Sequence, residues 1–153
     1  MVQYRRAGIG KRLVAAIVDG LIAGIPSSIP ILGPIIGTLY ILSKDALVYE
    51  LTGREDFRNR SIGKKLLDIE VIPPPDATHV DWNVSVRRNI PLALGSIIMI
   101  IPLLGWIIGP IVGLVVGLVE AGLILLSPDG RRFGDQLGGT IVVESEQIQR
   151  TRG

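Results

Sequence analysis

The stretch Lys11-Arg12-Leu13-Val14-Ala15-Ala16-Ile17-Val18-Asp19-Gly20 decides the fold, because it opens a long apolar run and carries a carboxylate into it. If this run crosses a bilayer as a helix, Asp19 lies in the hydrocarbon about two turns below Arg12. A charged side chain at that depth costs about 2.5–3.5 kcal/mol on insertion scales, so it is a candidate functional residue wherever it occurs. For every other charged residue in an apolar segment, the first question is therefore whether it can reach Asp19.

Two long stretches of the chain are almost free of charge. Between Leu13 and Ser43 the only ionisable side chains are Asp19 and Tyr40, and between Asn89 and Pro128 the only one is Glu120. Each stretch is long enough for two short membrane crossings. The sequence therefore predicts an all-α membrane protein whose four transmembrane helices cover residues 13–29, 33–49, 90–103 and 106–126.

The composition restricts the chemistry that this chain can perform. It has 153 residues, a mean hydropathy of +0.48 and no cysteine, so it has neither disulfides nor thiolate metal ligands. His79 is the only histidine, and no phosphate-binding glycine loop is present. We therefore predict no enzyme activity, no metal and no cofactor. The basic pI of about 9.2 does not indicate a nucleic-acid partner, because the positions of the basic residues fit a membrane better.

Those basic residues predict the orientation of the helices. The chain has sixteen Lys and Arg residues, and the two turns predicted on the outer side, at 27–32 and near Leu104-Gly105, contain none. All except Lys44 lie in or beside the termini and the central polar loop. By the positive-inside rule, we expect a multi-pass protein of the cell (inner) membrane with both termini and the central loop in the cytoplasm.

The polar segments are expected to lie on the cytoplasmic face. They contain short amphipathic parts and two β-like runs, Ile69–Ile72 and Thr140–Val143, which we expect to pair. Four basic residues in these segments are candidate lipid-interface residues, either as ordinary anchors or as phosphate ligands. They are Lys64, Lys65, Arg131 and Arg132.

Two motifs recur in the same order and at nearly the same offset. Residues 30–37 (PILGPIIG) resemble 102–109 (PLLGWIIG), and residues 60–66 (RSIGKKL) resemble 131–137 (RRFGDQL). The alternative is that Pro, Gly and Ile recur by chance in apolar sequence. We predict a single domain, residues 1–153, with an internal repeat of 1–77 and 78–149 related by an axis along the membrane normal.

Four ionisable residues are predicted at a similar depth of about 10 Å from the cytoplasmic face. They are Asp19, Lys44, Asp45 and Glu120. The simplest pairing joins Asp19 to Lys44 and leaves Asp45 and Glu120 to share a proton, a cation or an arginine. Such a layer is either a latch that fixes helix packing or a proton- or cation-binding site, unless Lys44 and Asp45 lie in the headgroups. Arg12 is expected to snorkel or to meet a carboxylate such as Asp135.

Small residues recur every fourth position on two of the predicted helices, which is typical of closely packed membrane helices. The rows contain Gly20 and Gly24 on the first helix, and Gly105, Gly109, Gly113 and Gly117 on the fourth. The partner of the longer row is either the first helix or another subunit.

These residues resemble the RDD family of small membrane proteins, which is named for an arginine, an aspartate and a second aspartate. Arg12, Asp19 and Asp135 stand at those positions, and the segments 61–67 and 131–143 resemble the two interfacial motifs of the family. Leu67-Asp68-Ile69 departs from the usual central motif. The resemblance implies a membrane domain for which transport is suspected, with some members linked to sodium/proton exchange, and it would assign Asp19 and Asp135 to ion handling.

We accordingly predict a cation- or proton-coupled transporter that uses membrane-buried carboxylates, with sodium/proton exchange as one form of it. Its predicted partners are the lipid bilayer, a sodium ion or proton, and further copies of the chain, since four short helices enclose little room for a pathway. The alternative is a non-transporting membrane scaffold or assembly subunit whose buried charges and glycine rows specify helix packing.

Overall fold

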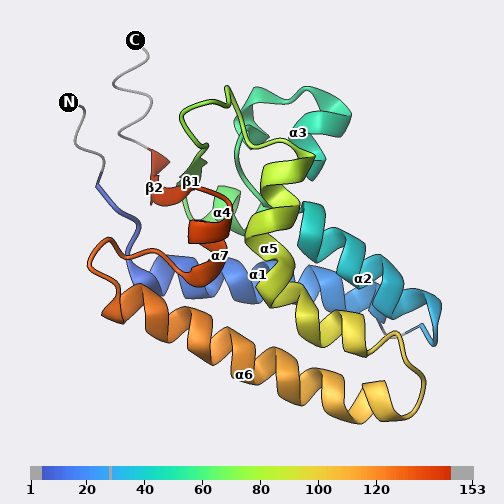
Figure 1. The fold of residues 1–153 in the computed structure, drawn as a ribbon. Helices are drawn as coiled ribbons and strands as arrows, with labels where there is room; N and C mark the ends of the chain where they lie inside the picture. Colours follow the sequence, from blue (N-terminus) through green and yellow to red (C-terminus); the bar gives the residue numbers. More distant parts are fainter. Residues whose placement is uncertain (1–4, 28, 146–153) are drawn as a thin grey trace.

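Long helices lie side by side below a cap of short helices and strands in the computed structural model, which describes residues 5–27 and 29–145 (Figure 1). The long helices are α1 (Ile9–Ser27), α2 (Leu32–Ser43), α5 (Trp82–Ile98) and α6 (Leu104–Leu126). The cap contains α3 (Leu47–Thr52), η1 (Glu55–Phe57), α4 (Ile62–Leu66), β1 (Ile69–Ile72), α7 (Phe133–Leu137) and β2 (Ile141–Glu144). The predicted mostly helical fold is thus confirmed.

One helix among the described residues is both long enough and apolar enough to span a membrane, and it is α6. Helix α1 has 19 residues but carries Lys11, Arg12 and Asp19, and α2 is apolar but has only 12 residues. Length and composition therefore identify one clear apolar span.

Helix α2 ends earlier than predicted, at Ser43 rather than at residue 49. A turn follows, and Leu47–Thr52 forms the separate helix α3. The physical reason is the pair Lys44-Asp45: both side chains are buried in the turn, where they face basic and acidic partners from other elements. The predicted position of these two residues inside the second long helix was therefore wrong.

Helix α5 begins eight residues before the predicted start at residue 90. Asp81 caps it, since its side chain accepts a hydrogen bond of 2.8 Å from the Val84 amide. The helix continues through Arg87 and Arg88, which the hydropathy pattern excluded, because Arg88 is fully buried against the carboxylates of Asp45 and Asp135. The first and fourth helices also begin earlier than predicted, at Ile9 and Leu104.

The two helix reversals have the same unusual geometry. Ile31 and Leu103 precede α2 and α6 with φ/ψ of 67/−59° and 66/−75°. In each case the amide of the next residue donates to the carbonyl of the preceding proline, at 2.8 Å for Leu32 and 2.9 Å for Leu104. These are γ-turns with positive φ, a rare and strained conformation for a branched side chain. Both reversals lie at the end of the helices away from the sheet (Figure 1).

The order of elements is similar in the two halves of the chain. Two long helices, a short helix and a strand follow one another as α1, α2, α4, β1 and again as α5, α6, α7, β2, with α3 and η1 added in the first half. This order and the matching γ-turns support the repeat, which stays a prediction; residues 146–149 of its second half lie outside the described residues.

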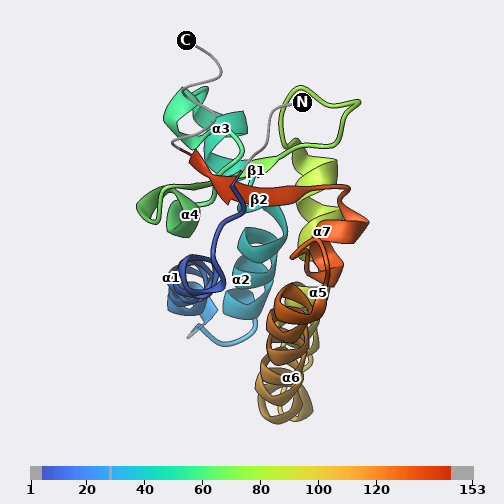
Figure 2. The same ribbon diagram turned by 90° about the vertical axis from the view of Figure 1, so that its left-hand side faces the viewer.

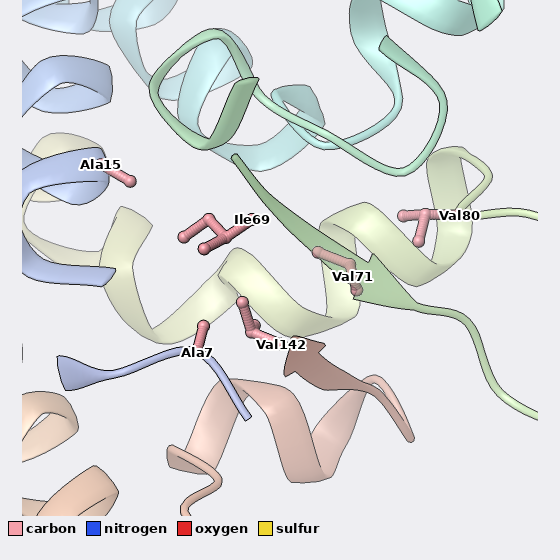
Figure 3. Close-up of a cluster of buried hydrophobic side chains, with 6 residues drawn as sticks. All are labelled: Ala7, Ala15, Ile69, Val71, Val80 and Val142. Atoms are coloured by element: carbon pink, nitrogen blue, oxygen red, sulfur yellow. The ribbon is translucent and has the colours of Figure 1, made fainter. Parts of the chain in front are cut away.

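The two strands pair, as predicted, and they hold the cap together. They are antiparallel, with Val71 opposite Val142 in the register. Figure 3 shows the buried apolar cluster that they form with neighbouring segments: Ala7, Ala15, Ile69, Val71, Val80 and Val142. Ala15 belongs to α1, so the cluster joins the sheet to the first long helix.

The longer glycine row packs on α5, and not on α1. An added Cβ at Gly105 would meet the Ile98 carbonyl, and one at Gly109 would meet Met99 and the Gly95 carbonyl. Gly113 faces the Cα of Gly95, whereas Gly117 faces open space. A Cβ at Gly20 or Gly24 would also meet nothing within 4 Å. The row on the first helix therefore has no close packing neighbour among residues 5–27 and 29–145.

Candidate functional site

Asp19 is buried, with 1% of its surface exposed. Its partners come from α2 with the turn that follows it and from α4 with its N-cap. Lys44 Nζ lies 3.1 Å from Oδ2, which is the predicted ion pair. The Ser61 hydroxyl donates to Oδ2 at 2.7 Å, and the Gly63 amide donates to Oδ1 at 2.8 Å. Tyr40 on α2 adds a longer hydrogen bond of 3.3 Å. The carboxylate thus joins α1 to the first turn of α4, where free amides are available to an anion.

Asp45 is fully buried in the turn after α2. Lys64 of α4 forms a close ion pair with Oδ1, and Arg88 Nε lies 3.1 Å from Oδ2. The Asn89 amide nitrogen donates to the same oxygen at 3.0 Å. Asp45 therefore links α4 to the first half of α5.

Asp135 of α7 is surrounded by three arginines and has no exposed surface. Arg88 donates to Oδ1 at 2.9 Å and Arg132 Nε donates to the same oxygen at 3.1 Å. Arg12 of α1 forms a close ion pair with Oδ2, so the predicted contact between Arg12 and Asp135 is present. Because Arg88 contacts both Asp45 and Asp135, it connects the two halves of the chain.

Glu120 lies on α6, and the first turn of α7 packs against it. Its carboxylate accepts from the Gly134 amide at 3.2 Å, and Arg132 Nε lies 3.7 Å away. Asp45 and Glu120 thus have separate partners, and the prediction that they share one was wrong. Asp45 pairs with Lys64 and with Arg88, which the early start of α5 brings to it, while Glu120 pairs with Arg132.

The four carboxylates and the basic side chains that pair with them form one buried network: Asp19, Asp45, Glu120 and Asp135 with Arg12, Lys44, Lys64, Arg88 and Arg132. Two of the four predicted lipid-interface residues belong to this network. Lys64 is 7% exposed and Arg132 is 8% exposed, and both neutralise carboxylates. Neither is therefore an ordinary exposed anchor, and their assignment as phosphate ligands stays a prediction. Lys65 and Arg131 are partly exposed and contact the acidic residues Asp56 and Asp129.

Sequence reasoning missed Arg88, which contacts more carboxylates of this network than Lys44 does. Its neighbours Ser85 and Asn89 lie on the same face of α5, at helical spacing, and all three have no exposed surface. The helical spacing of these three polar residues was the signal in the sequence. It can be recognised only if the helix is predicted to begin after the N-cap Asp81. The hydroxyl of Ser61 and the amide of Gly63, both ligands of Asp19, were also missed as site groups.

A pocket of about 460 Å³ opens between α1 and α6 and ends at this network. Its apolar walls come largely from these two helices. Helices α1 and α6 contact each other sparsely and are drawn apart in Figure 2. Two acidic side chains line the pocket, Asp19 and Glu120. The basic side chains that line it are Arg12, Lys44, Lys64, Arg88 and Arg132.

The described residues contain no group of three acidic, histidine or cysteine side chains placed to hold a metal ion. What the arrangement offers chemically is a set of ion pairs. Protonation of a carboxylate, or its binding of another cation, would release a lysine or an arginine.

The pKa of Asp135 gives this network a pH dependence. Burial alone would raise the pKa, but the charges of Arg132, Arg88 and Arg12 outweigh burial and hold it well below its usual range. The folded state therefore binds the proton more weakly than the unfolded state does. The stabilisation from Asp135 is fully present above the unfolded pKa of about 4 and is lost as the pH falls below it.

We therefore expect the midpoint of thermal unfolding, measured for the protein in detergent, to fall progressively below about pH 4. Since the titration of Asp135 contributes to this slope, the Asp135→Asn variant should show a smaller change over the same range. An equal pH slope in the two proteins would contradict the assignment.

Comparison with known protein families identifies a match over most of the chain. The model described as the RDD family matches residues 6–139, which is most of the chain. No curated protein and no solved structure matches it. The match confirms the resemblance that Arg12, Asp19 and Asp135 carry, and it supports the membrane character that the hydropathy predicts.

Proposed function

The chain belongs to the RDD family, and on that premise we propose that it is a multi-pass protein of the cell membrane that couples transport to a proton or a cation through its buried carboxylates. In the proposed topology α1, α2, α5 and α6 cross the bilayer, and the termini and the cap lie in the cytoplasm. The sixteen basic residues support this orientation, since none lies in either helix reversal.

The observation that carries the proposal is the pocket between α1 and α6. Both long-helix carboxylates, Asp19 and Glu120, line it, and each has a basic partner, Lys44 for Asp19 and Arg132 for Glu120. A proton or a small cation that enters the pocket can compete with Lys44 for Asp19. Since Asp19 holds α1 against α4, this competition would change the contact between a membrane helix and the cap.

The existing ion pairs of the carboxylates favour a second candidate function, that of a membrane scaffold. All four buried carboxylates of the network already have basic side chains as partners. In a scaffold these ion pairs fix the cap on the helices, and the exposed glycines Gly20 and Gly24 accept a helix from a further copy or another protein.

Ion flux into proteoliposomes separates the two candidates. Asp19→Asn alone leaves Lys44 buried without its partner and will lower stability. We therefore pair it with Lys44→Gln, so that both charges are removed together. For transport, we expect proton- or sodium-gradient-driven flux with the unaltered protein and none with the folded double variant.

The matched control is Arg54→Gln with Asp56→Asn, which removes an exposed ion pair in the cap. It should leave flux unchanged. Flux equal to that of empty liposomes for the unaltered protein would overturn the transport proposal, and the scaffold would then remain as the function.

A further inference from the structure

We propose that the pocket between α1 and α6 binds an anionic phospholipid, with its phosphate at the basic end and an acyl chain along the two helices. This inference rests on the proposed membrane topology and is independent of transport. Charge is the first argument. Five basic side chains line the pocket, against two carboxylates.

The excess of positive charge inside the pocket has a structural cause. Asp45 and Asp135 form ion pairs with Lys64 and Arg88, but neither carboxylate lines the pocket. The lining thus contains more basic than acidic side chains, because two of the four counter-charges, Asp45 and Asp135, lie outside it. The basic side chains at this end of the pocket can therefore attract an anionic group.

Lys44 has donors available for such an anion. Its side chain is 5% exposed, and among the described residues its one recorded polar partner is the Asp19 carboxylate. An ammonium group carries three donors. A phosphate oxygen at the pocket end can therefore accept from Lys44 while the ion pair with Asp19 persists.

The walls of the pocket fit a hydrocarbon chain. Ile17 on α1 is 61% exposed, and Leu114 and Leu118 on α6 are 65% and 64% exposed; all three line the pocket. In the proposed topology these side chains face the bilayer, which supplies lipid laterally. A volume of about 460 Å³ is enough for a phosphate and part of one chain. Basic pockets between membrane helices on the cytoplasmic side are suited to anionic headgroups.

Two glycines of α6 provide a matched test. A Cβ at Gly117 or at Gly122 would meet nothing within 4 Å, so neither backbone position excludes a side chain. Gly117 lines the pocket and Gly122 does not. Gly117→Leu should therefore fill the pocket, while Gly122→Leu should leave it open with the same gain in helix propensity.

Lipid binding is measured by native mass spectrometry of the full chain in detergent, titrated with dioleoyl phosphatidylglycerol or dioleoyl phosphatidylcholine. We expect phosphatidylglycerol to bind about tenfold more tightly, and Gly117→Leu to weaken it by about tenfold while Gly122→Leu has no effect. A separate titration with inorganic phosphate should not displace the lipid at equal concentration, because phosphate lacks the chain.

Equal binding of the two lipids would overturn the charge argument, and unchanged binding to Gly117→Leu would overturn the location. If Gly117→Leu instead changes the oligomeric state and leaves lipid binding intact, a second copy of the chain occupies the pocket and the proposal fails. Since no gradient is applied, an absence of transport would not affect these outcomes.

Discussion

Replacement of Asp135 by asparagine is expected to destabilise the folded protein by about 3–5 kcal/mol, the usual cost of removing one partner from a buried ion pair. Asp135 has no exposed surface, and its carboxylate contacts Arg12, Arg88 and Arg132. Asparagine keeps the shape but leaves three guanidinium groups with one negative charge fewer. Chemical or thermal unfolding of the detergent-solubilised protein measures the loss.

Asp129→Asn is the matched control. Asp129 also pairs with an arginine, Arg131, but its side chain is 36% exposed. Water and salt screen an exposed ion pair, so this variant should be nearly as stable as the unaltered protein. If the two variants lost the same stability, the buried network would not be the element that holds α7 to α1 and α5.

The second large effect is expected for Gly63→Ala. A Cβ at Gly63 would collide with the backbone carbonyl of Ala15 and would lie 2.8 Å from the Asp19 carboxylate. Neither helix backbone can yield by a side-chain rotation, so α4 must move away from α1. The clash costs about 1–3 kcal/mol. Loss of the hydrogen bond from the Gly63 amide to the charged Asp19 adds about 1.5–3 kcal/mol.

Gly10→Ala on α1 provides the comparison, since a Cβ there would meet nothing within 4 Å. Alanine has the higher helix propensity, so this variant should be as stable as the unaltered protein or more stable by up to about 1 kcal/mol. Equal unfolding midpoints for the two variants would show that α4 does not pack closely on α1.

The glycine rows show where pattern and packing diverge. The spacing on the first and fourth predicted helices is the same, and it predicts close packing for both. The structure packs Gly105, Gly109 and Gly113 on α5, but within the described part of the chain Gly20 and Gly24 have no close neighbour. Spacing marks a face that permits close approach. Which helix, if any, occupies that face depends on the arrangement of the whole chain.

The sequence by itself determined the features that depend on local composition and spacing. The charge-free stretches predicted the long helices, the paired β-like runs predicted the sheet, and Arg12, Asp19 and Asp135 predicted the family. The pair of Asp19 with Lys44 was also predictable, because a buried carboxylate requires an opposite charge at its own level.

Only the tertiary structure decided the role of the basic residues in the polar segments. By residue type and by position in the polar segments, Lys64, Arg88 and Arg132 resemble ordinary membrane anchors. Each is nevertheless buried against carboxylates from other elements. A lysine or arginine can be solvated at an interface or paired in the interior, and the sequence around it is compatible with both. Which of the two states a basic side chain adopts depends on whether carboxylates from distant parts of the sequence lie next to it. Here the packing of the cap on the long helices brings those carboxylates close.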